Sequence, residues 1–167
     1  MIDHERVTDG WPEWLVVRPL TPDDAQEIAA WRYAGPWQVY DPRAEDGLLD
    51  SADGYRAVVG ADEGRLVGFC CSGGEARVPG LEADPDLLDI GLGMAPAWVS
   101  GGHGFAFGQA VLDYFRRERP GVGLRAAVQS WNERSLRLTR RLGFVEVGRH
   151  NCTQNGQKVE YVLVIAR

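Results

Sequence analysis

Residues 87–106 read LLDIGLGMAPAWVSGGHGFA, and residues 132–144 read NERSLRLTRRLGF. In each stretch a predicted helix begins directly after a turn, at Gly101-Gly102-His103-Gly104-Phe105-Ala106 and at Asn132-Glu133-Arg134-Ser135. The first N–H groups of a helix have no partner within it and lie at the positive end of its dipole, so they bind phosphate well. The two turns together predict one bulky phosphorylated cofactor.

The strand predicted over residues 87–94 has one nearly bare face. Side chains alternate between the two faces of a strand. One face carries Ile90, Leu92 and Met94, and the other carries Asp89, Gly91 and Gly93. Glycine weakens a strand and usually marks a bulge, or a place where a ligand or another part of the chain comes close. The pattern alone leaves these alternatives open.

The rest of the sequence carries both helix and strand signals. Thr21 followed by Pro22 and two acids predicts the start of a helix that extends to about Tyr33. Glycine-containing turns predict two antiparallel hairpins. The first joins strands at residues 55–60 and 65–72, and the second joins strands at residues 144–148 and 159–165 around Asn155-Gly156. The segments between the hairpins predict strand–helix–strand crossovers. An α/β fold with a mixed sheet follows. The aromatic residues Trp37 and Tyr40 could line a pocket, but we expect them to fill core.

The composition is that of a single globular domain spanning residues 1–167. Of these 167 residues, 44% are hydrophobic and 25% are charged, so the chain can form a full core. It has 24 acidic and 18 basic residues, a net charge of -6, which gives no electrostatic support for a nucleic-acid partner. This charge suits a cationic acceptor, although modest acidity also serves solubility.

The sequence predicts neither a membrane span nor a secretory leader. No apolar run is long enough to cross a bilayer, and residues 1–6, MIDHER, lack the basic start and apolar continuation of a leader. Cys70 and Cys71 lie in an apolar run, and the three cysteines form neither a disulfide framework nor a zinc pattern. We therefore expect reduced core thiols, no metal site and, by default, a cytoplasmic location.

Two common phosphate motifs do not fit the glycine turn. A dinucleotide fingerprint requires GxGxxG, whereas Phe107 stands where the third glycine belongs. A Walker loop requires lysine followed by serine or threonine, and neither follows Gly104. The turn therefore indicates another phosphorylated ligand, with an unrelated nucleotide-binding module as an alternative.

Both turns resemble those of the GNAT superfamily of acyl-CoA-dependent N-acyltransferases. The pyrophosphate loop of that family follows a strand and has the form Arg/Gln-x-x-Gly-x-Gly/Ala; residues 101–106 occupy this frame, with Gly101 in place of Arg/Gln. Residues 132–135, followed by Gly143-Phe144, look like its second cofactor element, which pairs an asparagine and a serine or alanine with a terminal Gly-Phe. The likeness covers about residues 15–165.

The Asn-x-x-Ser form and the stretch from Trp11 to Thr21 look most like the branch that includes acetyltransferases of ribosomal-protein amino termini. The resemblance implies a mostly antiparallel sheet of about six or seven strands flanked by about four helices. It implies acetyl-CoA as cosubstrate and a primary amine as acceptor: a small amine, an antibiotic or a peptide N-terminus. A homodimer is compatible with it.

The resemblance implies cofactor-binding roles for nine residues. Backbone N–H groups of the glycine turn would bind the pyrophosphate, and the bare strand would pair with the pantetheine amides. An N–H at the end of that strand would stabilise the oxyanion as the amine attacks directly, and the second element would hold the far arm of the cofactor. The nine are Met94, Ala95, Gly101, Gly102, Gly104, Phe105, Ala106, Asn132 and Ser135.

The proton transfers are assigned from side-chain chemistry. Asp89, the carboxylate on the glycine-lined face of the strand over residues 87–94, is the predicted general base for the ammonium acceptor. Asp86 and Glu82 in the preceding loop are alternatives. Thr139 occupies the position where the family often has the tyrosine that protonates the leaving thiolate, which leaves that step to water, Tyr114 or another group. A catalytically weak, CoA-binding sensor is therefore the alternative function.

Overall fold

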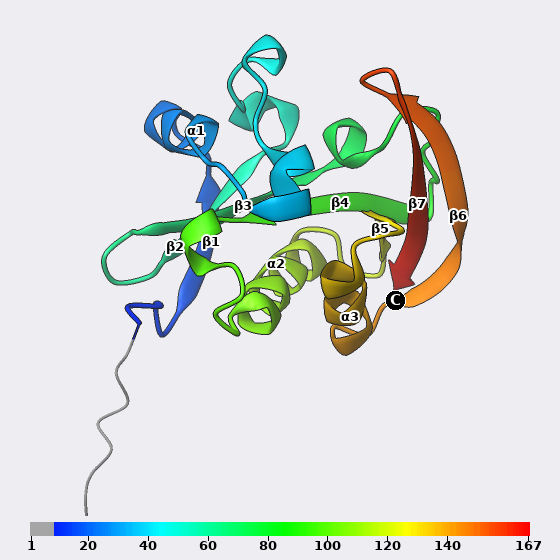
Figure 1. Ribbon diagram of the computed structural model, residues 1–167. Coiled ribbons are helices and arrows are strands. Elements are labelled where there is room, and N and C mark those ends of the chain that lie inside the picture. Colours follow the sequence, from blue (N-terminus) through cyan, green and yellow to red (C-terminus); the bar gives the residue numbers. More distant parts are fainter. Residues whose placement is uncertain (1–8) are drawn as a thin grey trace, which may run out of the picture.

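The computed structural model describes residues 9–167, which form one seven-stranded sheet with helices on both faces (Figure 1). The strand order is β1-β2-β3-β4-β5-β7-β6, and every neighbouring pair is antiparallel except β4 and β5. This arrangement confirms the predicted mixed, mostly antiparallel α/β fold. The residues in which we predict no secretory leader, 1–6, lie outside the described part.

The elements of residues 9–167 follow the expected order along the chain. The strands are β1 (Leu15–Pro19), β2 (Arg56–Gly60), β3 (Leu66–Ser72), β4 (Leu87–Met94), β5 (Gly123–Gln129), β6 (Val145–Gln154) and β7 (Gln157–Ala166). The α-helices are α1 (Pro22–Ala29), α2 (Gly104–Glu118) and α3 (Glu133–Arg141), and the short 3-10 helices are η1 (Gly35–Tyr40), η2 (Ala44–Asp46), η3 (Ser51–Asp53), η4 (Gly73–Ala76) and η5 (Pro96–Trp98).

Two boundaries differ from those predicted. Helix α1 ends at Ala29, before Tyr33, because the N–H of Ala30 bonds back to the carbonyls of Glu27 and Ile28 and closes the last turn. The strands of the final hairpin, β6 and β7, are longer than predicted. None of the helices within residues 9–167 is both long and apolar enough to cross a membrane.

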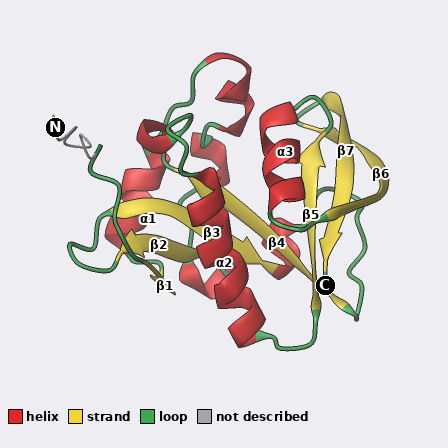
Figure 2. Cartoon of the chain, turned by 90° about the horizontal axis from the view of Figure 1, so that it is seen from below, coloured by secondary structure: helices red, strands yellow, loops and turns green. Residues whose placement is uncertain are grey.

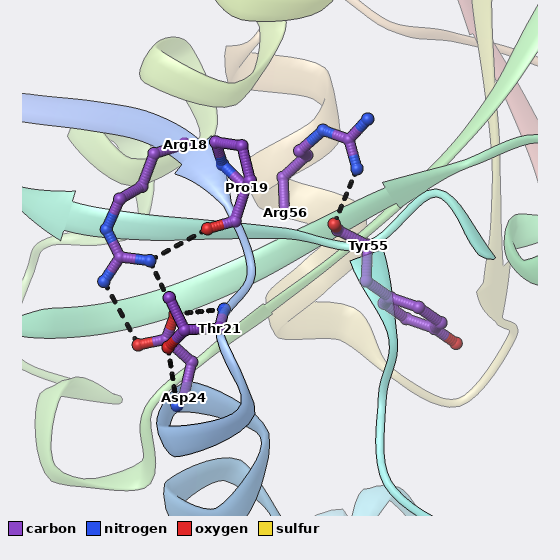
Figure 3. Close-up of polar contacts among 6 residues, drawn as sticks. All are labelled: Arg18, Pro19, Thr21, Asp24, Tyr55 and Arg56. Atoms are coloured by element: carbon purple, nitrogen blue, oxygen red, sulfur yellow. Dashed lines mark hydrogen bonds and ion pairs between the residues drawn. The ribbon is translucent and has the colours of Figure 1, made fainter. Parts of the chain in front are cut away.

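The capping predicted at Thr21 fixes the start of α1. The Thr21 hydroxyl accepts the N–H of Asp24 at 3.2 Å, and the Asp24 carboxylate accepts the N–H of Thr21 at 2.8 Å. Arg18 donates to the same carboxylate at 2.6 and 3.1 Å (Figure 3). Burial opposes the charge of Asp24, yet the bonds from Arg18 and Thr21 lower its pKa below the usual value. These contacts fasten α1 to the end of β1.

The core has two parts, one on each face of the sheet. Helix α2 crosses one face of the sheet (Figure 2). On this face Phe107 and Leu112 pack against Ile90 of β4 with almost no exposed surface. On the other face, the side chains of Ile28 and Trp31 pack over the first strands. The strands in the middle of the sheet are therefore covered on both sides. A backbone N–H or C=O group without a partner is unusual there, because buried backbone groups are nearly always hydrogen-bonded.

The glycines of β4 leave room for side chains of β3. A methyl group at Gly93 would lie 2.5 Å from the Phe69 ring, and one at Gly91 would lie 3.0 Å from the sulfur of Cys71. Phe69 and Cys71 are the register partners of these two glycines. Of the alternatives left open for the bare face, the structure supports the close approach of another part of the chain.

We predict that Gly68→Ala destabilises the protein by about 1–3 kcal/mol, because the new methyl group would overpack the sheet. It would lie 2.6 Å from the carbonyl oxygen of Gly93, a backbone atom that cannot move aside easily, and against the Phe107 ring. Gly148→Ala is the control, since nothing lies within 4 Å of its methyl group. Urea denaturation of both variants checks this, and equal stabilities would contradict it.

Candidate active site

Strands β4 and β5 pair only at their beginnings. Their register runs from Leu87 opposite Gly123 to Asp89 opposite Arg125 and then stops. Beyond this point β4 stays paired with β3 as far as Met94, whereas β5 stays paired with β7. Within residues 9–167, the edge of β4 that faces β5 therefore has no strand partner after Asp89, in the middle of the sheet. Free backbone groups there can pair with a ligand.

The alternation of an antiparallel pair decides which groups of β4 face this gap. The N–H of Ala95 donates to the carbonyl of Val67 at 2.8 Å, so the N–H groups two and four residues earlier also point toward β3. Those of Leu92 and Met94 point the other way, into the gap. Ala95 is thus not free to stabilise an oxyanion as expected, whereas the N–H of Met94 is. The Met94 carbonyl accepts the Tyr33 hydroxyl at 2.7 Å.

A second set of free donors lies at the start of α2. The first bond of the helix joins the N–H of Phe107 to the carbonyl of His103 at 3.0 Å, so the N–H groups of residues 104–106 have no partner within the helix. The side chain of His103 does not cap them; it pairs with Asp9 and stacks on Trp11, with 4.3 Å between ring centroids. Gly102 precedes the helix with a φ of 83°, which favours glycine.

One cleft of about 1500 Å³ includes both sets of donors. It exceeds the usual volume of a site for one small ligand and leaves room for two substrates. The predicted cofactor residues that line it are Met94, Gly102, Gly104, Phe105, Asn132 and Ser135. Ala95, Gly101 and Ala106 do not line it; the N–H of Gly101 bonds to the Trp98 carbonyl at 3.4 Å, and Ala106 is exposed on the first turn of α2.

Charges of opposite sign line different parts of the cleft. Three of the four arginines that line it come from α3, on the face of the sheet that α2 covers (Figure 1), and the fourth, Arg43, pairs with Glu45 on the other side. The acidic side chains come mainly from the loops and 3-10 helices of residues 41–75, on the opposite face. The α3 arginines are Arg134, Arg137 and Arg141; the acids of residues 41–75 are Asp41, Asp46, Asp53 and Glu75, and Glu133 of α3 also lines the cleft. The cleft thus suits an anionic ligand beside α3 and a cationic one on the other side.

Asp89, the predicted base, does not line this cleft. Its side chain is buried, and its carboxylate accepts N–H groups of Arg125 at 2.6 and 3.1 Å and of Arg77 at 3.2 Å. Arg125 also donates to the Glu82 carbonyl at 2.7 Å. Asp89 is therefore surrounded by cations at the last paired position of β4 and β5, where an acceptor amine cannot reach it. Its place indicates a structural role.

The other groups considered for proton transfer are also separated from the cleft or already engaged. Neither Glu82 nor Asp86 lines it. Tyr114 does not line it either; its hydroxyl oxygen accepts an N–H of Arg56 at 3.3 Å. Thr139 does line the cleft, but its hydroxyl donates to the Leu136 carbonyl at 2.8 Å.

Several cleft residues were not identified from the sequence. Tyr55 donates its hydroxyl to Glu75 at 3.1 Å, and burial, together with the charges of Cys71 and Glu75, raises the pKa of Tyr55. Trp37 and Tyr40, expected in the core, line the cleft instead. These side chains come from separate turns, so no local pattern marks them. The arginines of α3 could have been recognised, because their spacing places them on one helical face.

The cleft lies in the middle of a mixed α/β sheet and combines two sets of free backbone donors with charges of both signs. A family model described as an acetyltransferase (GNAT) domain matches residues 15–145. The chain therefore belongs to the GNAT acetyltransferase family. No curated protein matches the sequence significantly. Within residues 9–167, no group of three or more His, Cys, Asp or Glu side chains is arranged to hold a metal ion.

Solved structures share this fold at low sequence identity. A chimeric spermidine N-acetyltransferase SpeG from Vibrio cholerae and hSSAT is 19% identical, with a TM-score of 0.65 over 90% of this chain and 93% of that one. An aminoglycoside acetyltransferase AAC(6')-Ib in complex with coenzyme A is 17% identical, with a TM-score of 0.61 over 90% of this chain and 94% of that one. The ribosomal-protein-S5-alanine acetyltransferase from Vibrio fischeri is 16% identical, with a TM-score of 0.57 over 91% of this chain and 92% of that one.

We predict that Asp89→Asn lowers the free energy of unfolding by about 3 kcal/mol, because it leaves the buried cation of Arg125 without its counter-charge. Glu146→Gln is the matched control, since it breaks an exposed ion pair with Arg140 and should cost less than about 1 kcal/mol. Urea denaturation at neutral pH measures both. Equal, small losses would show that Asp89 does not hold β4 and β5 together.

Proposed function

We propose that this protein transfers an acetyl group from acetyl-CoA to a primary amine that attacks the thioester directly. One observation carries the proposal: the unpaired edge of β4 and the free start of α2 line the same cleft. An extended ligand with amides in one part and phosphates in another matches these two donor sets. Acetyl-CoA has both parts and supplies the activated acetyl group.

The residues of the cleft fit this cosubstrate. The N–H groups of residues 104–106 would hold the pyrophosphate, and the α3 arginines would neutralise phosphate charge. Arg134 donates to the Ser100 hydroxyl before the helix start, and the guanidinium of Arg141 lies 4.9 Å from the centroid of the Phe105 ring. These arginines supply the positive charge that the glycine turn lacks, since Gly101 stands in place of the Arg/Gln of the family's loop. The free N–H and C=O groups of Leu92 would pair with the pantetheine amides, and the N–H of Met94 would bind the thioester oxygen.

We assign the proton-accepting role to Glu75 in place of Asp89. Glu75 lines the cleft beside β4, and its carboxylate accepts a hydrogen bond from the Tyr55 hydroxyl at 3.1 Å. It is exposed, and no Arg, Lys or His of residues 9–167 pairs with it. A primary ammonium group must lose a proton before it can attack, and Glu75 would take that proton and release it to water. When the C–S bond breaks, the CoA thiolate would take a proton from water, so that the products are the N-acetylated amine and free thiol.

The class of the acceptor is supported by charge and by similar folds. The acids on the Glu75 side of the cleft would attract an ammonium group, and proteins of similar fold act on spermidine and on aminoglycosides. A small amine, an antibiotic amine and a peptide N-terminus all carry this group. We expect the reaction to take place in the cytoplasm.

The test is amine-dependent release of free thiol from acetyl-CoA, with a panel of polyamines, aminoglycosides and peptides. We predict release with at least one amine, and binding of CoA by calorimetry. Gly104→Glu should abolish both, because it places a carboxylate among the phosphate-binding N–H groups; circular dichroism would verify its fold. CoA binding without any release would support the sensor, and nucleotide binding without CoA binding would contradict the proposal.

For Glu75→Gln we predict a kcat lower by about 10²–10³-fold at neutral pH, with an unchanged KM for acetyl-CoA. The loss should shrink as the pH approaches the pKa of the amine, about 10 for an alkyl amine and about 8 for a peptide N-terminus, because more of the acceptor is then neutral in solution. Asp53→Asn, which alters another carboxylate of the cleft, should have a much smaller effect. A loss that does not depend on pH would remove Glu75 from the proton transfer.

A further inference from the structure

The side chain of Asn132 forms three hydrogen bonds within the protein. It is only 4% exposed. Its carbonyl oxygen accepts the N–H of Ser135 at 3.1 Å, which caps α3, and the indole N–H of Trp37 at 3.4 Å. Its amide nitrogen donates to the Tyr40 hydroxyl at 3.1 Å. Two residues of η1 thus contact Asn132, the N-cap residue of α3.

These bonds fix the orientation of the amide. An asparagine side chain can accept two hydrogen bonds and donate two. In Asn132 both acceptor positions and one N–H are used within the protein, which leaves one N–H. The flipped amide would direct its NH₂ group at the N–H groups of Ser135 and Trp37, so donors would face donors. Asn132 can therefore offer a ligand one hydrogen-bond donor and no acceptor.

Helix η1 is held in place chiefly from the cofactor side of the cleft. It has no buried residue of its own. The guanidinium of Arg134 lies over the Trp37 ring, 3.9 Å from its centroid, and donates to the Ser100 hydroxyl at 2.7 Å. Tyr40 stacks on Trp131, with 6.1 Å between the ring centroids. Ser100 lies directly before the glycine turn, so these contacts join η1 to both turns that the sequence singled out.

We propose that Trp37 and Tyr40 are positioning residues, which orient Asn132 so that its remaining N–H donates to an amide carbonyl of the pantetheine arm of CoA. This rests on the proposed function. The polar hydrogen of Trp37 is already used by Asn132, so Trp37 acts through that residue rather than on the cofactor. An extended chain with amide carbonyls would satisfy this lone buried donor, and a nucleotide without that chain offers it no amide carbonyl.

The test compares two ligands by calorimetry. CoA contains the pantetheine arm, and adenosine 3',5'-bisphosphate lacks it. For Tyr40→Phe and for Trp37→Phe we expect CoA binding to weaken about five-fold, the loss typical of one hydrogen bond, and bisphosphate binding to stay unchanged. Tyr114→Phe removes the same hydroxyl outside the cleft and should change neither affinity. Thermal melting would verify that every variant is folded.

A double-mutant cycle tests the route through Asn132. Asn132→Ser keeps a side-chain cap for α3 but removes the N–H donor. In that background Tyr40→Phe should add no further loss of CoA affinity, because the group it orients is gone. Additive losses, equal weakening of both ligands, or an unchanged CoA affinity in Tyr40→Phe would each overturn the positioning role.

The same measurements distinguish a protein that does not bind CoA from one that binds CoA without help from Trp37 and Tyr40. If the unmodified protein binds no CoA, the proposed function fails and the positioning role fails with it. If the unmodified protein binds CoA and the η1 variants bind it equally well, only the role of Trp37 and Tyr40 is contradicted. Neither outcome depends on knowing the acceptor amine.

Discussion

The ion pair between Asp89 and Arg125 lies where β4 and β5 separate, and the cleft depends on that separation. The two residues face each other at the last register position of the pair, and their side chains bond at 2.6 Å with almost no exposure. A buried ion pair has a large desolvation cost, which good geometry and extra hydrogen bonds offset. Here Arg77 and the Glu82 carbonyl supply those bonds. Further pairing of the strands would close the gap that exposes Leu92 and Met94.

The chemistry of the cleft follows from the two faces of the sheet. On one side the free start of α2 and the arginines of α3 favour negative charge; on the other, the loops of residues 41–75 contribute carboxylates. The gap between β4 and β5 connects these environments. The protein itself supplies no reactive thiol here, because burial raises the pKa of Cys70 and Cys71 to about 12. Direct attack by the acceptor amine is consistent with this.

The sequence predicted features whose causes are local. The N-caps at Thr21 and Asn132, the glycine turn at residues 101–106 and the two hairpins all depend on neighbouring residues, and the structure shows them where they were expected. The resemblance to one family followed from the spacing of two such turns, and the family match confirms it.

Features that depend on distant partners were not predictable in this way. Asp89 was assigned as a base because its strand face looked bare, but Arg125, Arg77 and the side chains of β3 occupy that face. The N–H of Ala95 is bonded because of the register with β3. Trp37 and Tyr40 meet Asn132 only in the folded chain, since residues far apart in sequence form that contact.

Amide hydrogen exchange in the presence and absence of CoA shows whether the free edge of β4 binds the cofactor. The N–H groups of Leu92 and Met94 point into the gap, whereas those of Gly91 and Gly93 point toward β3. We expect CoA to slow exchange at Leu92 and Met94 and to leave Gly91 and Gly93 nearly unchanged. Saturating CoA that leaves exchange at Leu92 and Met94 unaltered would contradict cofactor binding at this edge.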